Sequence, residues 1–268
     1  MNRAVPQAQL SDQAALRLIC LPYAGGGAAS YYRWRSEFPA AIDIVPLSLP
    51  GHDGRLNETP VKDLRELVAL LVDELTEHAL DRPYALAGHS MGAWIAFEMA
   101  RTLRRRKLRM PSVLIVAASR PPDSVTVSER LHQLPDDKLV ATVDGRYGGI
   151  PSAIRRQPAV LRLLLPVLRA DLEMIENYCY VEEPPLDVEV LALGGTGDPA
   201  VAPAQLADWR RHTTRVFSVR LFPGGHFFLF QGNGPTAGGS QSSLATSAPS
   251  AVVARLTRLI GHATMKCK

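Results

Sequence analysis

The sequence has few of the features that mark disulfide-bonded, metal-binding or membrane proteins. Its 268 residues include three cysteines, Cys20, Cys179 and Cys267, and no Cys-x-x-Cys pair, so neither a disulfide framework nor a zinc site is predicted. The first fifteen residues lack the apolar stretch of a signal peptide, and no apolar run approaches membrane-spanning length. We therefore expect a cytoplasmic protein with no bound metal and no membrane contact.

The sequence also lacks a large excess of charge of either sign. Thirty lysines and arginines against 26 acidic residues give a net charge of +4 and an isoelectric point near 9.1. No nucleic-acid-binding motif accompanies this mild basicity, so nucleic acid is not an expected partner. The densest basic run, RTLRRRKLR at residues 101–109, has two open interpretations: a solvated helix end or a contact for an acidic partner.

Six short apolar runs predict buried strands, at residues 16–21, 42–47, 84–87, 113–118, 188–193 and 216–222. Most are continuously apolar, as expected for a parallel sheet that is covered on both faces. The clearest helical pattern lies between the second and third runs, at residues 60–80, with Thr59 as the expected N-cap and Pro60 in the first turn. This alternation predicts an α/β protein with a mostly parallel central sheet flanked by helices.

The chain length suits a single domain, expected over residues 15–268, with an insertion. Residues 121–180 show helical patterns without a strand signal and predict a helical lid over the carboxyl edge of the strands, with ordinary packing helices as the alternative. Residues 231–250 have almost no large apolar side chains and predict a flexible loop, and residues 1–14 predict a flexible tail. No coiled-coil or repeat pattern is present, and we expect a monomer.

The strongest motif is GHSMG at residues 88–92. A Gly-x-Ser-x-Gly sequence alone is common, but this one follows a strand-like run and precedes an apolar helical stretch at residues 94–103. That context is typical of the nucleophile elbow of the α/β-hydrolase fold, in which a tight turn needs small flanking residues and presents the serine hydroxyl beyond the sheet edge. We therefore predict this fold, with Ser90 as the nucleophile and not simply a structural turn residue.

A serine nucleophile needs a general base, and that base needs a carboxylate partner. Of the seven histidines, His226 comes just after the last predicted strand, which places it at the same sheet edge as Ser90. Asp198 follows the penultimate strand, although an aspartate also suits a turn before proline, and Asp123 after the fourth strand is the competing acid. The chain order Ser90, Asp198, His226 is the order used by this fold.

An oxyanion hole requires two backbone N–H donors directed at the developing charge. We expect one donor from Met91, the residue after the nucleophile. The second is expected from the glycine-rich segment PYAGGG at residues 22–27, where Ala24 is the preferred donor and Tyr23 the alternative. This segment has the spacing of neither common nucleotide-binding motif, so a nucleotide cofactor is not expected.

The chain resembles the type II thioesterases, the free-standing editing enzymes of polyketide and nonribosomal peptide synthesis. The resemblance extends over roughly residues 16–230, and residues 231–250 are longer than expected before the last helix. The matching segments are LPYAGG at 21–26, PG at 50–51, GHSMG at 88–92, YGGIP at 147–151, residues 164–178, GG with Asp198 at 194–198 and FPGGHFF at 222–228.

This resemblance implies hydrolysis of mis-primed, stalled or product acyl chains from the phosphopantetheine thiol of carrier proteins. It implies a triad of Ser90, Asp198 and His226, with Met91 and Ala24 as oxyanion donors. The implied partners are carrier-protein domains of a synthase, which the basic run could contact, and the phosphopantetheine belongs to the substrate, so no cofactor is expected. A carboxylesterase or lipase, an acyltransferase and a non-catalytic binding protein on the same scaffold stay open as alternatives.

Overall fold

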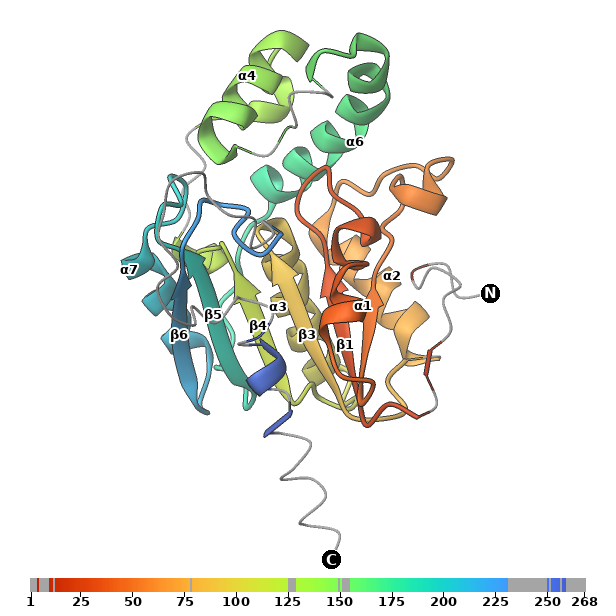
Figure 1. Ribbon diagram of the computed structural model, residues 1–268, viewed down its shortest axis with the longest axis vertical. Coiled ribbons are helices and arrows are strands. Elements are labelled where there is room, and N and C mark those ends of the chain that lie inside the picture. Colours follow the sequence, from red (N-terminus) through yellow and green to blue (C-terminus); the bar gives the residue numbers. More distant parts are fainter. Residues whose placement is uncertain are drawn as a thin grey trace, which may run out of the picture.

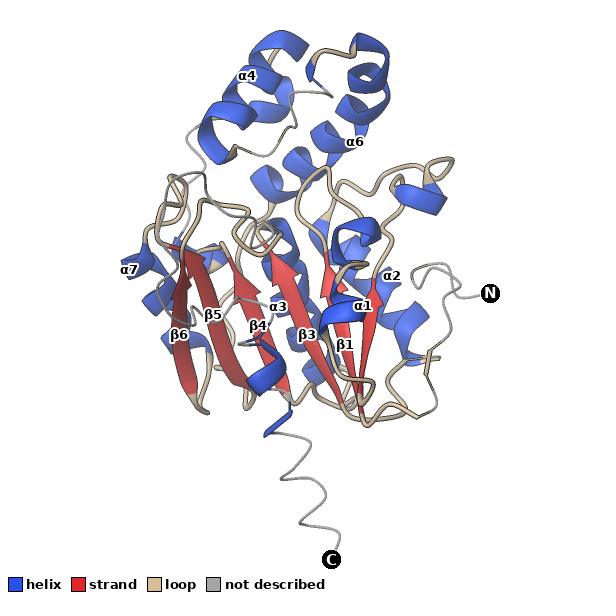
Figure 2. Cartoon of the chain, viewed as in Figure 1, coloured by secondary structure: helices blue, strands red, loops and turns tan. Residues whose placement is uncertain are grey.

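The computed structural model describes residues 4, 10–11, 13–77, 79–124, 129–148, 150, 155–230, 250, 252–255 and 257–258. Within them, six strands form one parallel sheet in the order β2-β1-β3-β4-β5-β6. The strands are β1 (Leu16–Leu21), β2 (Ile42–Pro46), β3 (Tyr84–His89), β4 (Val113–Ala117), β5 (Glu189–Gly195) and β6 (Phe217–Phe222). The predicted α/β class, with a parallel sheet between helices, is confirmed (Figure 2).

Helices cover both faces of the sheet (Figure 1). Along β1, Ile19 and Leu21 pack with helices of one face, whereas Leu18 and Cys20 pack with helices of the other. Successive side chains of a strand point to opposite faces, and both faces are apolar here, which explains the continuous apolar runs. The first face carries α2 (Leu64–Thr76), α3 (Met91–Arg105), α7 (Pro203–Leu206) and η5 (Ala207–His212), and the second carries η1 (Ala28–Tyr31) and α1 (Trp34–Glu37).

The winding of the chain reverses beside β1. From β1 the chain passes to β2 on one side and then returns to β3 on the other, with α1 on one face of the sheet and α2 and α3 on the opposite face. The loops that follow β1 and β3 therefore diverge at the carboxyl edge, which is where doubly wound sheets bind ligands. Residues 22–27, called here the oxyanion loop, and Ser90 follow these two strands.

The predicted insertion contains two long helices beyond this carboxyl edge, at the top of Figure 1. They are α4 (Asp136–Tyr147) and α6 (Pro158–Asn177), preceded by η3 (Pro122–Ser124) and η4 (Leu131–Gln133). Leu131, Leu139, Leu165 and Leu172 form a small core that joins η4, α4 and α6. We call residues 129–148 and 155–177 the lid, because they lie over the edge that carries Ser90.

The helix predicted over residues 60–80 is shorter than its apolar pattern suggests. It begins at Leu64, and its N-cap is Asp63, not Thr59. The Asp63 carboxylate accepts hydrogen bonds from the N–H groups of Arg65 at 2.8 Å and Glu66 at 2.9 Å. Because a carboxylate that satisfies two free N–H groups is a strong N-cap, the helix starts after this residue and not at Pro60.

Several sequence predictions fall wholly or mostly outside the described residues: the tail at 1–14, the loop at 231–250 and Cys267. Cys20 is buried and Cys179 is exposed, and both are free thiols. Burial raises the pKa of the Cys20 thiol, as expected for a small packed side chain and not a reactive one. No helix in the described ranges is long and apolar enough to cross a membrane.

Candidate active site

Ser90 occupies the sharp turn between β3 and α3. Its φ of 54° lies in the left-handed region, where a residue with a side chain is strained. A Cβ atom on Gly88 would lie 2.0 Å from the carbonyl oxygen of Gly92, and one on Gly92 would lie 2.2 Å from that of Leu21. Both glycines are therefore required by packing, and the Ser90 N–H is held by the Ala117 carbonyl at 2.8 Å.

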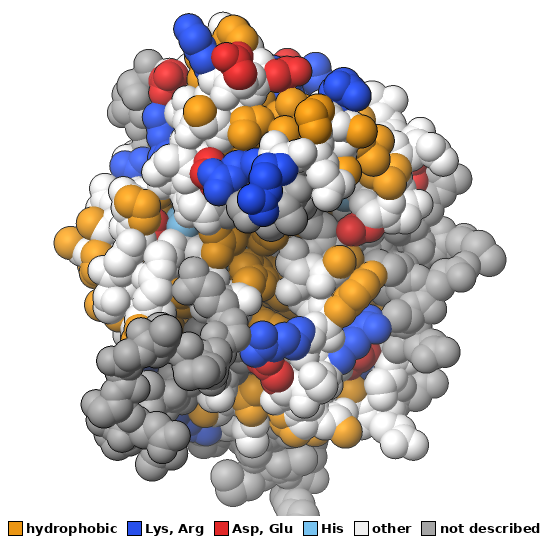
Figure 3. All heavy atoms as spheres, turned by 45° about the horizontal axis from the view of Figure 1, so that its top comes forward, with side chains coloured by type: hydrophobic (Ala, Val, Ile, Leu, Met, Phe, Trp, Pro, Cys, Tyr) orange, Lys and Arg blue, Asp and Glu red, His pale blue; other side chains and the backbone are white. Residues whose placement is uncertain are grey.

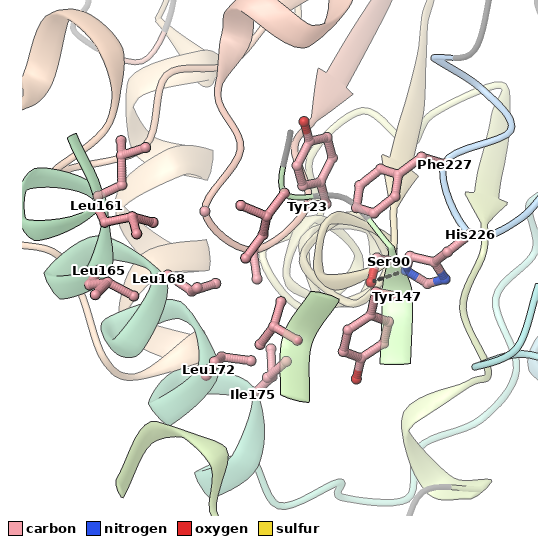
Figure 4. Close-up of a pocket in the computed structure, with 15 residues that line it drawn as sticks. Tyr23, Ser90, Tyr147, Leu161, Leu165, Leu168, Leu172, Ile175, His226 and Phe227 are labelled. Atoms are coloured by element: carbon pink, nitrogen blue, oxygen red, sulfur yellow. Dashed lines mark hydrogen bonds between the residues drawn. The ribbon is translucent and has the colours of Figure 1, made fainter. Parts of the chain in front are cut away.

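The structure brings Ser90, His226 and Asp198 into one hydrogen-bonded series. His226 Nε2 lies 3.1 Å from Ser90 Oγ (Figure 4), and Nδ1 lies 2.9 Å from Asp198 Oδ2. Asp198 Oδ1 accepts hydrogen bonds from the N–H groups of Ala200 at 2.8 Å and Val201 at 3.2 Å. The carboxylate therefore keeps the proton on Nδ1, which leaves Nε2 to accept the serine proton.

The competing acid, Asp123, is engaged elsewhere. Its Oδ1 lies 3.0 Å from His212 Nε2, and its Oδ2 accepts a hydrogen bond from Arg211 Nε at 2.6 Å. Of the two aspartates considered from the sequence, the structure places Asp198 beside His226.

His89, next to the nucleophile in sequence, is fully buried among aromatic rings. Its ring centroid lies 5.1 Å from Phe230, 5.3 Å from His226, 5.6 Å from Phe227 and 5.7 Å from Tyr23. Neither ring nitrogen has a hydrogen-bond partner among the residues that the structure places. Burial, and then the neighbouring His226, hold the pKa of His89 well below its usual range, so its ring packs as a neutral group.

Two further histidines have carboxylate partners of their own. His52 pairs with Asp171, and His132 pairs with Glu176 in the lid. His78 and His262 are outside the described residues.

An apolar cavity of about 260 Å³ opens at Ser90. Tyr23, Ala24 and Gly25 of the oxyanion loop line one side of it, and Phe227 lies next to His226. The opposite wall is formed by the side chains of α6 that Figure 4 labels, Leu161, Leu165, Leu168, Leu172 and Ile175. A hydrocarbon chain bound in this cavity would be removed from water without burying a polar group.

A second cavity, of about 370 Å³, also reaches Ser90 and His226. Arg120 and Arg146 are among the residues that line it. The space-filling view in Figure 3 shows a hollow with hydrophobic side chains in its floor and Lys or Arg side chains beside it. Arg146 is paired with Glu129 at 2.8 Å, whereas the half-buried Arg120 guanidinium meets no acceptor within the described ranges. The nucleophile thus stands where an apolar cavity and a basic one meet.

Each of the two proposed oxyanion donors lines one of the cavities that reach Ser90. Ala24 lines the apolar cavity and Met91 lines the basic one. The oxyanion loop turns at Ala24 and Gly25, because the Gly26 N–H donates to the Tyr23 carbonyl at 2.9 Å and Gly25 has a φ of 71°. The first turn of α3 packs directly against this loop, since a Cβ on residue 92 would also lie 2.7 Å from the carbonyl of residue 22.

Two residues of the site had little or no signal as site residues in the sequence. Tyr147, the last residue of α4, lines both cavities, and its ring lies 4.9 Å from that of His226. The Asp171 carboxylate, from α6, accepts a hydrogen bond from the Gly25 N–H. The available signal for Asp171 is its place on the apolar face of α6, three residues after Leu168, where a charged residue needs a partner.

The basic run at residues 101–109 lies at the other end of α3. Arg105 comes fourteen positions after Met91, which is about 21 Å along the helix. Arg101 is buried between Glu98 and Glu183, and Arg105 also pairs with Glu183. Arg101 and Arg105 therefore tie a neighbouring segment to the helix, whereas a contact between the exposed residues of the run and an acidic partner stays a prediction.

Comparisons with known proteins identify the family of the chain. The family described as Thioesterase domain matches residues 16–238. The gramicidin S biosynthesis protein GrsT of Aneurinibacillus migulanus is 36% identical over 231 residues, which cover 86% of this chain and 90% of GrsT. RedJ, a thioesterase from the prodiginine biosynthetic pathway of Streptomyces coelicolor, has a TM-score of 0.79 and 39% identity, with 86% of this chain and 91% of RedJ covered. YbtT, a type II thioesterase from the yersiniabactin NRPS/PKS pathway, has a TM-score of 0.79 and 28% identity, with 97% and 99% covered.

Proposed function

The chain belongs to the thioesterase domain family, and from this we propose that it hydrolyses acyl groups from the phosphopantetheine thiol of carrier proteins in polyketide or nonribosomal peptide synthesis. The predicted family and enzyme class are confirmed by the family match and by relatives that are type II thioesterases of such pathways. The observation that carries the proposal is the position of Ser90, between an apolar cavity and a basic one.

In the proposed acylation step, His226 Nε2 accepts the Ser90 proton as Oγ attacks the thioester carbonyl carbon. Asp198 keeps Nδ1 protonated and stabilises the imidazolium that forms. The N–H groups of Met91 and Ala24 donate to the carbonyl oxygen as it gains negative charge. The carbon–sulfur bond then breaks, and His226 returns its proton to the departing sulfur, which leaves an acyl ester on Ser90.

The deacylation step uses the same residues. A water molecule in the place of the departed thiol gives a proton to His226 Nε2 and attacks the acyl-enzyme carbonyl. Collapse of the second tetrahedral intermediate releases the carboxylic acid and returns the proton to Ser90 Oγ. The proposed cycle requires only the side chains of this protein and water, so the phosphopantetheine enters as part of the substrate and no cofactor is used.

The two cavities receive different parts of the proposed substrate. The acyl chain lies along the leucines of α6, where its hydrocarbon is removed from water. The pantetheine arm lies in the second cavity, where Arg120 is available to an acceptor of the arm or its phosphate. The carrier protein then docks at the mouth of this second cavity and not at the basic run on α3. We further propose that the enzyme acts as a monomer in the cytoplasm, together with its synthase.

The experiment that tests this proposal compares hydrolysis of an acyl-loaded carrier protein with hydrolysis of an oxygen ester that has the same acyl group. The enzyme is expected to release the acyl group rapidly from the carrier and only slowly from the oxygen ester. Ser90→Ala should abolish release, whereas Ser36→Ala, at an exposed serine of α1, should leave it unchanged.

Other outcomes would support the alternatives. Cleavage of the oxygen ester with the carrier thioester left intact would make the protein a carboxylesterase with the same triad. Transfer of the acyl group to an added alcohol or amine faster than to water would make it an acyltransferase. Absence of both turnover and labelling by an active-site serine probe would indicate a non-catalytic binding protein.

A further inference from the structure

A carboxylate from the lid reaches the loop that carries the proposed Ala24 donor. Asp171 Oδ2 accepts a hydrogen bond from the Gly25 N–H at 2.7 Å and lies 2.9 Å from His52 Nε2. The side chains of Asp171 and His52 are only 3% and 4% exposed. One oxygen atom therefore joins α6, the oxyanion loop and the loop after β2, three segments that are distant in sequence.

The hydrogen-bond partners of His52 determine where its protons lie. Its Nδ1 lies 3.1 Å from the Pro50 carbonyl oxygen, which can only accept, so Nδ1 carries a proton. Its Nε2 faces the Asp171 carboxylate, which also only accepts when ionised. Both contacts are satisfied when His52 is an imidazolium beside an ionised Asp171. Loss of the Nε2 proton would place a nitrogen lone pair against the carboxylate.

The Asp171 contact sets the orientation of one peptide group in the oxyanion loop. The Gly25 N–H belongs to the Ala24–Gly25 peptide, which follows directly after the peptide that carries the Ala24 N–H. Gly25 has a φ of 71°, and a Cβ at this position would lie 3.2 Å from Leu168 Cδ1, so α6 also limits the space beside the turn. Leu168 and Asp171 are three residues apart and thus contact the loop from the same face of α6.

We propose that Asp171 is a positioning residue for the hydrolysis: by holding the Gly25 N–H, it fixes the loop that presents the Ala24 N–H, so that the oxyanion hole is complete only while α6 is seated on the loop. The inference rests on the proposed function in one respect, namely that Ser90 forms an acyl-enzyme through an oxyanion intermediate. The Asp171–Gly25 contact links occupation of the apolar cavity to catalysis, because α6 supplies both the cavity wall and Asp171.

The geometry makes the contact between His52 and Asp171 dependent on pH. The charged groups that face His52 are Asp171 from α6 and Asp53 from η2 (Asp53–Arg55). Burial lowers the pKa of His52, but the hydrogen bond and charge of Asp171 outweigh it, so the pKa is raised above its ordinary value. Because the pKa of His52 is raised, its contact with Asp171 is fully formed below the ordinary histidine pKa of about 6.5. The contact is lost as the pH rises through the raised pKa.

The test measures kcat and KM against pH for a short acyl thioester and its matched oxygen ester. Asp171→Asn should lower kcat at least tenfold, up to the roughly 10²–10³-fold loss seen when a whole oxyanion donor is removed, with little change in KM. His52→Gln should retain kcat near pH 7 within about threefold, because a Gln amide can donate to Asp171 at any pH. In this variant the alkaline fall of kcat that we expect in the wild type should disappear.

The matched controls are Glu176→Gln and His132→Gln, which alter a similar His–carboxylate pair inside the lid that does not contact the oxyanion loop. Amide hydrogen exchange at residues 22–27 should become faster in Asp171→Asn and stay unchanged in Glu176→Gln, and it reports the contact without a substrate. Thermal unfolding shows whether each variant is folded, and the His52→Gln profile decides the matter if Asp171→Asn does not fold.

Two results would overturn the inference: a kcat in Asp171→Asn no lower than in Glu176→Gln, or the same alkaline limb in the wild type and His52→Gln. Faster exchange in Asp171→Asn, combined with a wild-type protein that hydrolyses neither ester, would instead overturn the proposed function and leave the Asp171–Gly25 contact standing.

Discussion

Two aspartates follow neighbouring strands at the carboxyl edge, and each has a histidine partner. Asp123 follows β4 and pairs with His212, whereas Asp198 follows β5 and pairs with His226. Both pairs have the spacing of a hydrogen bond, at 3.0 Å and 2.9 Å. Of these two histidines, only His226 contacts Ser90. The contact with Ser90, and not the distance within the His–Asp pair, therefore shows which pair can assist the nucleophile.

Asp198→Asn should lower kcat by about 10⁴-fold, because an amide can donate to Nδ1 and so favours the tautomer in which Nε2 carries the proton. KM should change little, since neither cavity is lined by this residue. The measurement is steady-state hydrolysis of a short acyl thioester. Asp123→Asn is the matched control and should keep nearly full kcat. A large loss of kcat in this control and not in Asp198→Asn would assign the acid to Asp123.

Among the elements, α6 contributes to the site in two ways, and both use residues of one helix face. Its leucines form the wall of the apolar cavity, and Asp171 on the same face reaches the oxyanion loop. Pro166 lies inside the helix and lacks the N–H that would continue the ladder there, yet the helix extends from Pro158 to Asn177. Apolar spacing predicts a helix in this region, but it does not show which end of the helix lies nearest the nucleophile.

Figure 4 places Leu161 at the end of the apolar cavity remote from Ser90. For the wild type, kcat/KM should rise by about fourfold per methylene of the acyl chain until the cavity is full, since each buried methylene contributes about 0.8 kcal/mol. Leu161→Trp should move this maximum to shorter chains by filling the far end, with acetyl and propionyl thioesters unaffected. The measurement is kcat/KM over a series of acyl thioesters of increasing length.

The control for this series is Leu163→Trp, on the same helix but 61% exposed and outside the cavity lining. It should leave the whole chain-length profile unchanged. An equal shift in both variants would mean that the lid as a whole, and not the filled cavity end, sets the preference.

In the molecule as a whole, both cavities open at the carboxyl edge, whereas the basic run of α3 lies at the opposite end of that helix. Arg104 of this run donates to the carbonyl groups of Pro184 and Pro185, and with Arg101 and Arg105 it pairs with Glu183. The run therefore stabilises the return of the chain from the lid toward β5. The half-buried Arg120 is the better placed cation for a substrate that approaches Ser90.

Arg120→Gln should raise KM roughly five- to tenfold for acyl-phosphopantetheine and for the acyl-carrier protein, and leave it unchanged for a short acyl thioester that lacks the arm. The reason is that a charge-assisted hydrogen bond contributes more than one between neutral groups. Comparing acyl-pantetheine with acyl-phosphopantetheine shows whether the arm or its phosphate is the acceptor. Arg220→Gln, on β6 and exposed, lines neither cavity and should behave as the wild type. An equal rise in KM for all substrates would exclude a role specific to the arm.

The sequence by itself was sufficient for the α/β class, the six strands and the turn at Ser90, because each depends on residues a few positions apart: apolar runs for the strands, and glycines two positions either side of the serine for the elbow. The strand-end positions of Asp198 and His226 could be predicted too, since parallel strands bring their carboxyl ends to one edge. Only the tertiary structure decided which aspartate faces His226, and it alone revealed that Asp171 holds a loop 146 residues away and that the arginines of α3 are paired internally. Such contacts join side chains whose separation in the sequence carries no periodic signal, so the packing of the folded chain determines them.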